Sequence, residues 1–264
     1  MWLFLIAVVF GNPVFGSPLP FRVVIDPGHG GSDQGTVYHR GHYRLTEKNV
    51  TLQLARRIAS ELRKKHYFVA LTRNSDREVS LPARTSLANH FGADIFISIH
   101  MNSTESLPSK NATGIETFIL NNTTDASSRR LARLENSILT AQKLQNSPEQ
   151  TDVALILKDL RLDANLSESK LLACSVQNKL VHATSSNSRG VKQALFHVLL
   201  GADMPSILVE AGFLNNKRDR NWVTSKAGQL KISQAIASAI EEYQAHQLSK
   251  TSKSSATLSR CKVN

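Results

Sequence analysis

Cysteine is nearly absent from this sequence: only Cys174, in a helical pattern, and Cys261, near the C-terminus, occur among 264 residues. So few cysteines exclude a fold built on a disulfide framework, and their spacing matches no cysteine metal site. A single bridge between the two stays open as an alternative to two separate thiols. Stability must come from a hydrophobic core, for which 264 residues with 41% hydrophobic content suffice.

Signatures of several enzyme classes are also missing. Gly28-His29-Gly30 lacks the third glycine of a dinucleotide-binding loop, and no glycine-rich loop ends in the Lys-Ser/Thr pair of a P-loop. The chain contains neither a Gly-x-Ser-x-Gly nucleophile elbow nor a His-Glu-x-x-His helix. These absences argue against nucleotide-binding folds of both kinds and against a serine hydrolase.

Long apolar runs are missing apart from Met1–Phe10, which is followed by Gly11, Asn12, Pro13 and the small pair Gly16-Ser17. This run is shorter than the ~20 residues of a membrane span and has the length of a signal-peptide core. We therefore expect a signal peptide at residues 1–16, an exported periplasmic protein and no stable membrane span. The run lacks a positive n-region, so a misplaced start codon is the alternative.

Acidic residues are the scarcer charge, since 21 Asp and Glu stand against 32 Lys and Arg, which gives +11 at neutral pH. This excess favours an acidic partner such as nucleic acid, an anionic lipid or an anionic cell-wall polymer. No arginine-rich helix or basic stripe interleaved with aromatics is present, so nucleic acid is not an expected partner. Part of the charge falls in residues 248–264, which predict a disordered basic tail.

Hydrophobic periodicity predicts alternating strands and helices. Strands are expected at Arg22–Asp26, Phe68–Leu71, Asp94–His100, Gly114–Leu120, Phe196–Leu200 and Ile207–Val209. Helices are expected after Thr46 as N-cap and at Pro82–Phe91, Ser127–Leu144, Val153–Leu160, Glu168–Thr184 and Ser225–Gln247, with Gly28–Tyr43 as a polar loop. This order predicts one α/β domain over residues 22–247, with a mixed, mostly parallel sheet flanked by helices and a helical insert at 121–188.

Four titratable side chains are expected at one edge of that sheet, because functional groups collect beyond the carboxyl ends of strands. His29 follows the first strand, His100 ends the third, Glu210 follows Ile207–Val209, and Glu47 begins a helix. Two imidazoles and one carboxylate form a common catalytic zinc shell, and a second carboxylate can move a proton. The pattern predicts a metal-assisted hydrolase, although each residue taken alone has a structural alternative.

Seven segments in the same order resemble the zinc-dependent N-acetylmuramoyl-L-alanine amidases over about residues 22–245. They are Val24–Gly31, Glu47–Asn49, Thr72-Arg73 with Asp76, Arg84 with Ala88-Asn89, Ala93–Asn102, Gly114–Phe118 and Met204–Asn216. The resemblance implies a peptidoglycan hydrolase that cleaves the amide between the lactyl group of N-acetylmuramic acid and the L-alanine of the stem peptide. It places such an enzyme in cell-wall remodelling and daughter-cell separation.

The resemblance also implies roles for single residues. His29, Glu47 and His100 match the ligands of a Zn²⁺ cofactor, and Glu210 matches the catalytic carboxylate. Asn102 and Glu116 are assigned more loosely, to the substrate groove or to support of the metal shell. Arg73 and Arg84 are expected to be structural.

Part of the expected insert, about residues 125–165, resembles the regulatory segment of the cell-division amidases, through Leu131–Ser137 and Leu155–Leu160. In that subgroup a helix covers the active site until an activator protein displaces it. By analogy Glu135 would approach the metal and inhibit the enzyme; the alternative is a solvated helix. The sequence departs from the family at Leu195, where a proline is expected.

Two rival functions remain at the level of sequence. A non-catalytic wall-binding or regulatory protein could keep the fold, although all four expected site residues are present. A zinc peptidase acting on the stem peptide is the second rival.

Overall fold

The computed structural model describes residues 20–102, 111–143, 160–251 and 261–263; for 138–143 and 160–164 it describes the backbone only. The leader expected at residues 1–16 and residues 153–159 of an expected helix lie outside this range. None of the helices in the described part of the chain is long and apolar enough to cross a membrane.

Six strands form one mixed sheet in the order β4-β1-β5-β8-β6-β7. All neighbouring pairs are parallel except β6 and β8, which run antiparallel. The expected α/β architecture with a mostly parallel sheet is confirmed. The strand bounds are β1 Arg22–Pro27, β4 Phe68–Leu71, β5 Ile95–Asn102, β6 Ile115–Leu120, β7 Ser188–Ala194 and β8 Ser206–Phe213.

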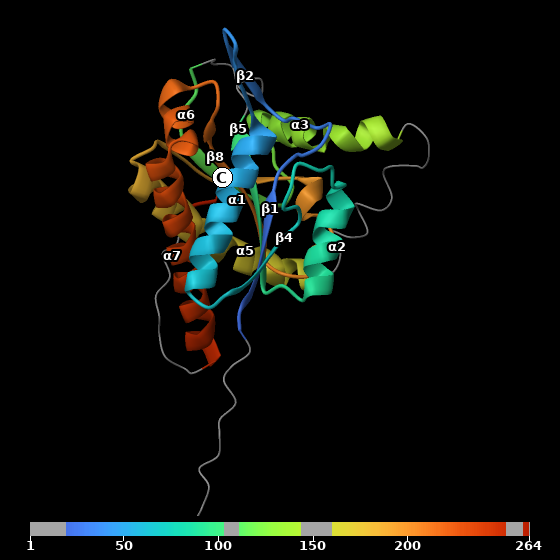
Figure 1. Ribbon diagram of the computed structural model, residues 1–264. Coiled ribbons are helices and arrows are strands. Elements are labelled where there is room, and N and C mark those ends of the chain that lie inside the picture. The colour runs from blue at the N-terminus through green and yellow to red at the C-terminus, as the bar shows by residue number, and fades with distance from the viewer. Residues whose placement is uncertain (1–19, 103–110, 144–159, 252–260, 264) are drawn as a thin grey trace, which may run out of the picture.

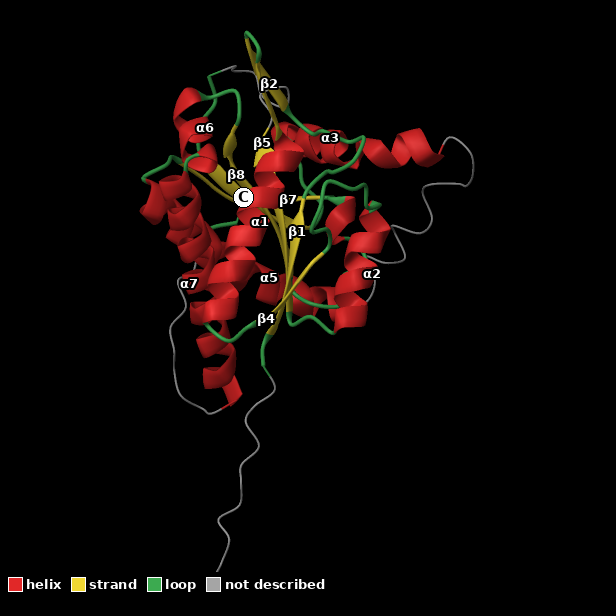
Figure 2. Ribbon diagram, viewed as in Figure 1, coloured by secondary structure: helices red, strands yellow, loops and turns green. Residues whose placement is uncertain are grey.

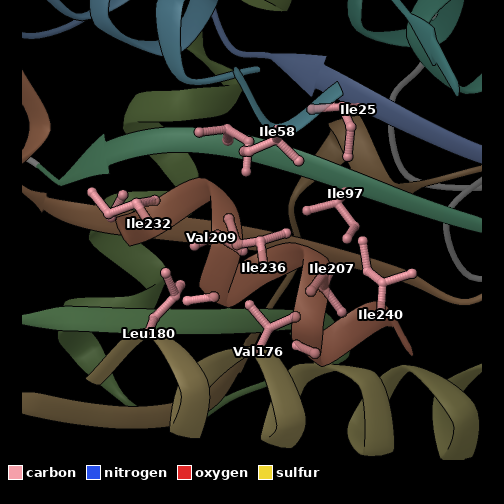
Figure 3. Close-up of a cluster of buried hydrophobic side chains, with 14 of the residues drawn as sticks. Ile25, Ile58, Ile97, Val176, Leu180, Ile207, Val209, Ile232, Ile236 and Ile240 are labelled. Atoms are coloured by element: carbon pink, nitrogen blue, oxygen red, sulfur yellow. The ribbon is translucent and has the colours of Figure 1, made fainter. Parts of the chain in front are cut away.

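Helices cover both faces of the sheet (Figure 2). One face packs against α1 (Glu47–Lys64), α5 (Leu160–Thr184) and α7 (Lys226–Thr251), and the other lies under α2 (Leu81–Phe91) and α3 (Ala126–Lys143). The larger core lies on the first face, where Ile25, Ile97 and Ile207 of three strands meet Ile58 and Ile236 of two helices (Figure 3). These strands are buried on both faces, which explains their continuous apolar sequence.

The prediction of a polar loop at Gly28–Tyr43 is wrong in its second half. Val37–Arg40 (β2) and Tyr43–Thr46 (β3) form an antiparallel hairpin, with Gly41 at φ 57° in the turn. A two-residue turn of this kind needs positive φ, which glycine adopts without strain. The hairpin projects from the body of the molecule beside α3 (Figure 1).

Other element predictions also need correction. Phe196–Leu200 is not a strand, because His197–Leu199 forms a 3₁₀ turn (η2) that packs beside α2. The edge strand β7 and the short helix α6 (Lys217–Thr224) were missed. Thr46 does precede α1 as its N-cap, but its hydroxyl makes no capping hydrogen bond.

The two parts of the expected insert lie in different surroundings. In α5, Leu172, Val176 and Leu180 are fully buried in the core. By contrast, α3 lies across the opposite face near the carboxyl ends of β5 and β8 (Figure 1). The helix α3, which lies within the expected regulatory segment, therefore covers the edge of the sheet where the candidate site residues lie.

The C-terminal segment is fixed to the fold by a disulfide between Cys174 and Cys261. Val263 then forms a parallel bridge with Val191 of β7. The expectation of a disordered tail from residue 248 is wrong at both of its ends, since α7 continues to Thr251 and residues 261–263 are held. Residues 252–260 lie outside the described range.

Candidate metal and catalytic site

The turn after β1 delivers His29 with a positive φ of 62°, which is uncommon for a residue with a side chain. Gly28 makes this turn fit, because a Cβ at that position would lie 2.4 Å from Nε2 of His100. Buried Arg73 and Arg84 donate hydrogen bonds to the carbonyl oxygens of Gly28 and His29, respectively, at 2.8 and 3.0 Å. Both arginines therefore hold the turn, as expected.

Glu47 begins α1, where the positive end of the helix favours a carboxylate. Its two oxygens accept hydrogen bonds from the backbone N–H of Thr36 at 2.8 Å and of Met101 at 2.7 Å. These contacts come from the segment before the hairpin and from the end of β5. They fix the carboxylate between the two histidines, where it is fully buried.

His29, Glu47, His100 and Glu135 converge on one point, with one ligand atom from each lying within 4.8 Å of the others. Oε1 of Glu47 lies 3.0 Å from Nε2 of His29 and 3.2 Å from Nδ1 of His100. Oε2 of Glu135 lies 3.3 and 3.0 Å from the same two nitrogens. The four residues come from a turn, two helices and a strand.

The donors of this cluster suit a metal ion. Nε2 of His29, Nδ1 of His100 and Oε2 of Glu135 are buried without a hydrogen-bond partner among the described residues. Such orphaned atoms are rare unless something else satisfies them. Nitrogen and carboxylate donors in this number are typical of zinc sites.

The electrostatics of the cluster also demand positive charge. Burial lowers the pKa of His100, but Glu135 and Glu47 more than offset this and raise it to about 10. The pKa of His29 is likewise raised well above its usual range, against burial, by Glu47 and Glu135. Burial raises the pKa of Glu47, but the two histidines lower it overall. The carboxylates thus attract either protons or a cation to this point.

Asp33 supports the cluster from outside, and the sequence reasoning missed it. Its Oδ2 lies 2.7 Å from Nδ1 of His29. A carboxylate in this position accepts the Nδ1 hydrogen and leaves the Nε2 lone pair for a metal. The available signal was a carboxylate four residues after the histidine.

Glu210 lies beside the cluster without joining it. The β5–β8 register pairs it with His100, and the residue is fully buried. Neither of its carboxylate oxygens has a hydrogen-bond partner in the part of the chain that the structure describes. Burial, with the negative charges of Glu135, Glu47 and Glu116, raises its pKa well above the usual range, although His100 opposes this. Such a carboxyl group holds a proton more readily than an exposed glutamate does, which suits a group that must accept and pass on a proton.

Asn102 and Glu116 lie farther along the same sheet face and form a separate group. The side-chain amide of Asn102 donates to Oε1 of Glu116, while Arg189 and Lys192 donate to Oε2. Neither residue belongs to the cluster that could hold a metal. Their position beside Glu210 follows from the β6–β8 register, in which Glu116 faces Glu210.

α3 covers the cluster by placing the carboxylate of Glu135, which is 8% exposed, against His29 and His100. The next residue fixes the helix to the loop after β7. Asn136 donates to the carbonyl oxygen of Leu195 at 2.7 Å and accepts from the backbone N–H of His197 at 2.9 Å. Leu195, the departure from the family pattern, thus lies at this contact.

A cleft of about 540 Å³ opens beside α3 and reaches the cluster. Its walls include His29, Asp33 and Glu135 on the cluster side, and His39 and Arg44 on the hairpin side. The site is therefore reached along the groove between α3 and the hairpin.

Comparison with known proteins identifies relatives of this chain. A family model described as N-acetylmuramoyl-L-alanine amidase matches residues 23–242. The amidase AmiA of Escherichia coli K12 is 31% identical over 223 residues, which cover 84% of this chain and 75% of the relative. The amidase AmiC of Neisseria meningitidis serogroup B is 32% identical, but the chain spans about half of that relative, 52%.

A solved structure extends the likeness to the fold. The N-acetylmuramoyl-L-alanine amidase of Clostridium difficile 630 superposes with a TM-score of 0.64 at 30% identity, covering 86% of this chain and 97% of that chain. The family match spans both histidines, Glu47, Glu135 and Glu210. The chain therefore belongs to the N-acetylmuramoyl-L-alanine amidase family, as its motifs predicted.

Proposed function

We propose that this protein is a zinc-dependent hydrolase of peptidoglycan that cleaves the amide between the lactyl group of N-acetylmuramic acid and the L-alanine of the stem peptide. The observation that carries the proposal is the convergence of His29, Glu47 and His100 beside the unpartnered carboxyl group of Glu210. Membership of the amidase family supplies the substrate class.

Each residue has a role in this reaction. His29, Glu47 and His100 would hold the metal, which supplies Lewis-acid polarisation of a carbonyl and acidifies water. Glu210 would accept a proton from the attacking water and deliver it to the departing nitrogen of L-alanine. Its burial and its lack of a fixed hydrogen-bond partner among the described residues leave it able to take both roles.

The net charge and the disulfide of the chain fit this activity. The anionic wall polymer suits the excess positive charge of the chain, +11 at neutral pH. Export to the periplasm is part of the proposal, and the Cys174–Cys261 disulfide supports it because such bonds persist in oxidising compartments.

Product analysis tests the reaction. The full chain carrying Glu135→Ala, loaded with zinc, is incubated with purified muropeptides beside the matched chain carrying Glu135→Ala and Glu210→Gln. We expect the first protein alone to release disaccharide and stem peptides with a free L-alanine amino terminus, identified by mass spectrometry. Cleavage inside the stem would indicate a peptidase, and binding without any product would indicate a non-catalytic wall protein.

We further propose that α3 inhibits the enzyme and that an activator protein displaces it. The position of Glu135, 3.0 Å from His100 and 3.3 Å from His29, supports this because its carboxylate occupies the place that water needs. We expect Glu135→Ala to raise the hydrolysis rate of the wild-type chain at least tenfold, since this change frees one coordination position. Arg133→Ala, at an exposed position of the same helix, is the control. Equal rates for Glu135→Ala and wild type would contradict inhibition.

A further inference from the structure

Beside Glu210 lies a charged group that the proposed reaction does not use. Glu116 of β6 is buried, and its Oε2 accepts from Nε of Arg189 at 3.0 Å and from Nζ of Lys192 at 2.6 Å. Asn102 donates to the other oxygen. Two cations of β7 therefore meet a single carboxylate, and the group carries a surplus positive charge.

The cations keep unused hydrogen-bond donors. Arg189 contacts Glu116 only through Nε, and its two terminal nitrogens make no hydrogen bond to any residue that the structure describes. A guanidinium that served only to neutralise a carboxylate would be expected to pair through two nitrogens. The side chains of Arg189 and Lys192 are 22% and 16% exposed, and the rings of Phe213 and Phe118 lie beside them. The two side chains are thus held in place while some of their N–H groups remain without a hydrogen-bond acceptor among the described residues.

The face of the sheet that carries these donors lies under α3. Glu116 and Glu210 face each other across β6 and β8, and Lys192 shares that face with Phe118, over which α3 packs. Burial raises the pKa of Asp125, the residue before α3, but hydrogen bonds from Ser127 and Ser128 and the charge of Lys192 lower it overall. Glu135 of α3 therefore reaches the metal cluster, while Asp125, directly before α3, lies within electrostatic reach of Lys192.

We propose that Arg189 and Lys192 form a subsite for a carboxylate of the stem peptide, and that Glu116 and Asn102 are positioning residues that hold the two cations. The inference rests on the proposed amidase function. Two strand spacings, about 10 Å, separate β7 from β8 and its Glu210. An extended peptide covers that distance in about three residues. The carboxylate therefore belongs to one of the first residues after the scissile amide.

Two substrates that differ in one charge test this subsite. Synthetic disaccharide tripeptides are prepared with a free carboxylate or a carboxamide at the second stem residue, and a second pair varies the third residue. With the zinc-loaded full chain carrying Glu135→Ala, we expect one pair to show a preference for the carboxylate of about 10- to 100-fold in kcat/KM, the size of a charged hydrogen bond. We expect Arg189→Met or Lys192→Met to reduce this ratio to about twofold.

Controls separate recognition from structure. Lys192→Arg, which keeps the charge, is expected to retain the preference, and so is Lys226→Met at an exposed position of α7. Equal loss on acid and amide substrates in Lys192→Met would assign a structural role and overturn the proposal. So would the absence of any preference in the parent chain.

A binding measurement tests the subsite independently of the proposed hydrolysis. Calorimetry with the free stem tripeptides, in acid and amide forms, needs no hydrolysis. A carboxylate preference that is lost in Lys192→Met, in a chain that cleaves nothing, would support the subsite and refute the proposed function. Equal affinities for both forms would refute the subsite even in an active enzyme.

Discussion

Two buried carboxylates on the same face of the sheet have opposite surroundings. Asp26 of β1 is fully buried, and both of its oxygens are bonded: Arg84 at 2.7 Å and Thr72 on one, Ser98 at 2.7 Å on the other. Glu210 of β8 is equally buried, and neither oxygen has a partner among the residues that the structure describes. Burial raises the pKa of both groups, but Arg84 and the two hydroxyls lower that of Asp26 overall, whereas the pKa of Glu210 stays raised.

This difference separates scaffold from chemistry. A buried carboxylate with both oxygens bonded supports the scaffold: Asp26 pairs with Arg84, which in turn donates to the carbonyl oxygens of Pro27 and His29 in the turn. A buried carboxyl group left without partners destabilises the fold and is retained where a reaction needs it. Substitution of Glu210 should therefore reduce activity, whereas substitution of Asp26 should reduce stability.

The largest effect is expected at Glu210. Glu210→Gln keeps the shape of the side chain but removes the group that moves the proton, so kcat should fall about 10²- to 10⁴-fold. Because no contact among the described residues is lost, the free energy of unfolding should stay within about 0.5 kcal/mol of the parent or rise. Urea unfolding and product release measure the two quantities on one preparation. A clear loss of stability would mean that Glu210 is part of the scaffold.

The converse change at Asp26 should act on stability. Asp26→Asn leaves the buried guanidinium of Arg84 without its counter-charge, which costs about 3–5 kcal/mol of unfolding free energy. Asp203→Asn, at an exposed position, should change it by less than about 0.5 kcal/mol. Equal denaturation midpoints for the two variants would contradict the comparison.

Metal binding should depend on pH with a definite sign. Because the pKa of His100 is raised to about 10, its imidazole is protonated in the metal-free protein at neutral pH, and the pKa of His29 is raised in the same direction. Zinc must displace those protons, so its affinity should increase about tenfold per pH unit for each proton released, up to about pH 10. Calorimetry in buffers of different ionisation enthalpy counts the protons, and we expect one to two. An affinity that does not change between pH 6.5 and 8.5 would refute this.

The smallest effect is expected at Asn136, whose two hydrogen bonds hold α3 to the loop after β7. Two such bonds contribute about 1–2 kcal/mol, so Asn136→Ala should raise the hydrolysis rate of the otherwise unchanged chain roughly 5- to 30-fold. Arg133→Ala is again the control. A rate equal to that of the parent would show that Asn136 does not hold α3 closed.

The sequence predicted those parts of the molecule whose pattern is local. The buried strands carry continuous apolar runs, so their places and the residues that follow them could be read directly. The hairpin was missed because His39, Arg40 and Arg44 give it no apolar face, and β7 was missed because its charged residues pair with Glu116 on a neighbouring strand. Phe196–Leu200 misled the prediction because its apolar residues are buried in a 3₁₀ turn.

The candidate site was predictable in its members more than in its connections. His29 follows β1, and His100 and Glu210 lie near the carboxyl ends of β5 and β8, where open sheets place their functional groups. Glu135 was named only through the family resemblance, since a glutamate on an amphipathic helix has no local signal that it will meet two distant histidines. The partnership of Asp33 with His29 had only its four-residue spacing as a signal, and the cation pair at Glu116 depends on contacts between neighbouring strands that one sequence does not show.

The bond between Cys174 and Cys261, 87 positions apart, closes about the last third of the chain into a covalent ring. β7, β8, α6 and α7 lie within this ring, whereas His29, Glu47 and His100 precede it. A protease that cut the chain once inside the ring would leave both pieces attached, visible as two bands only on a reducing gel. Glu210 would remain tethered to α5 by sulfur when its own peptide connection was gone.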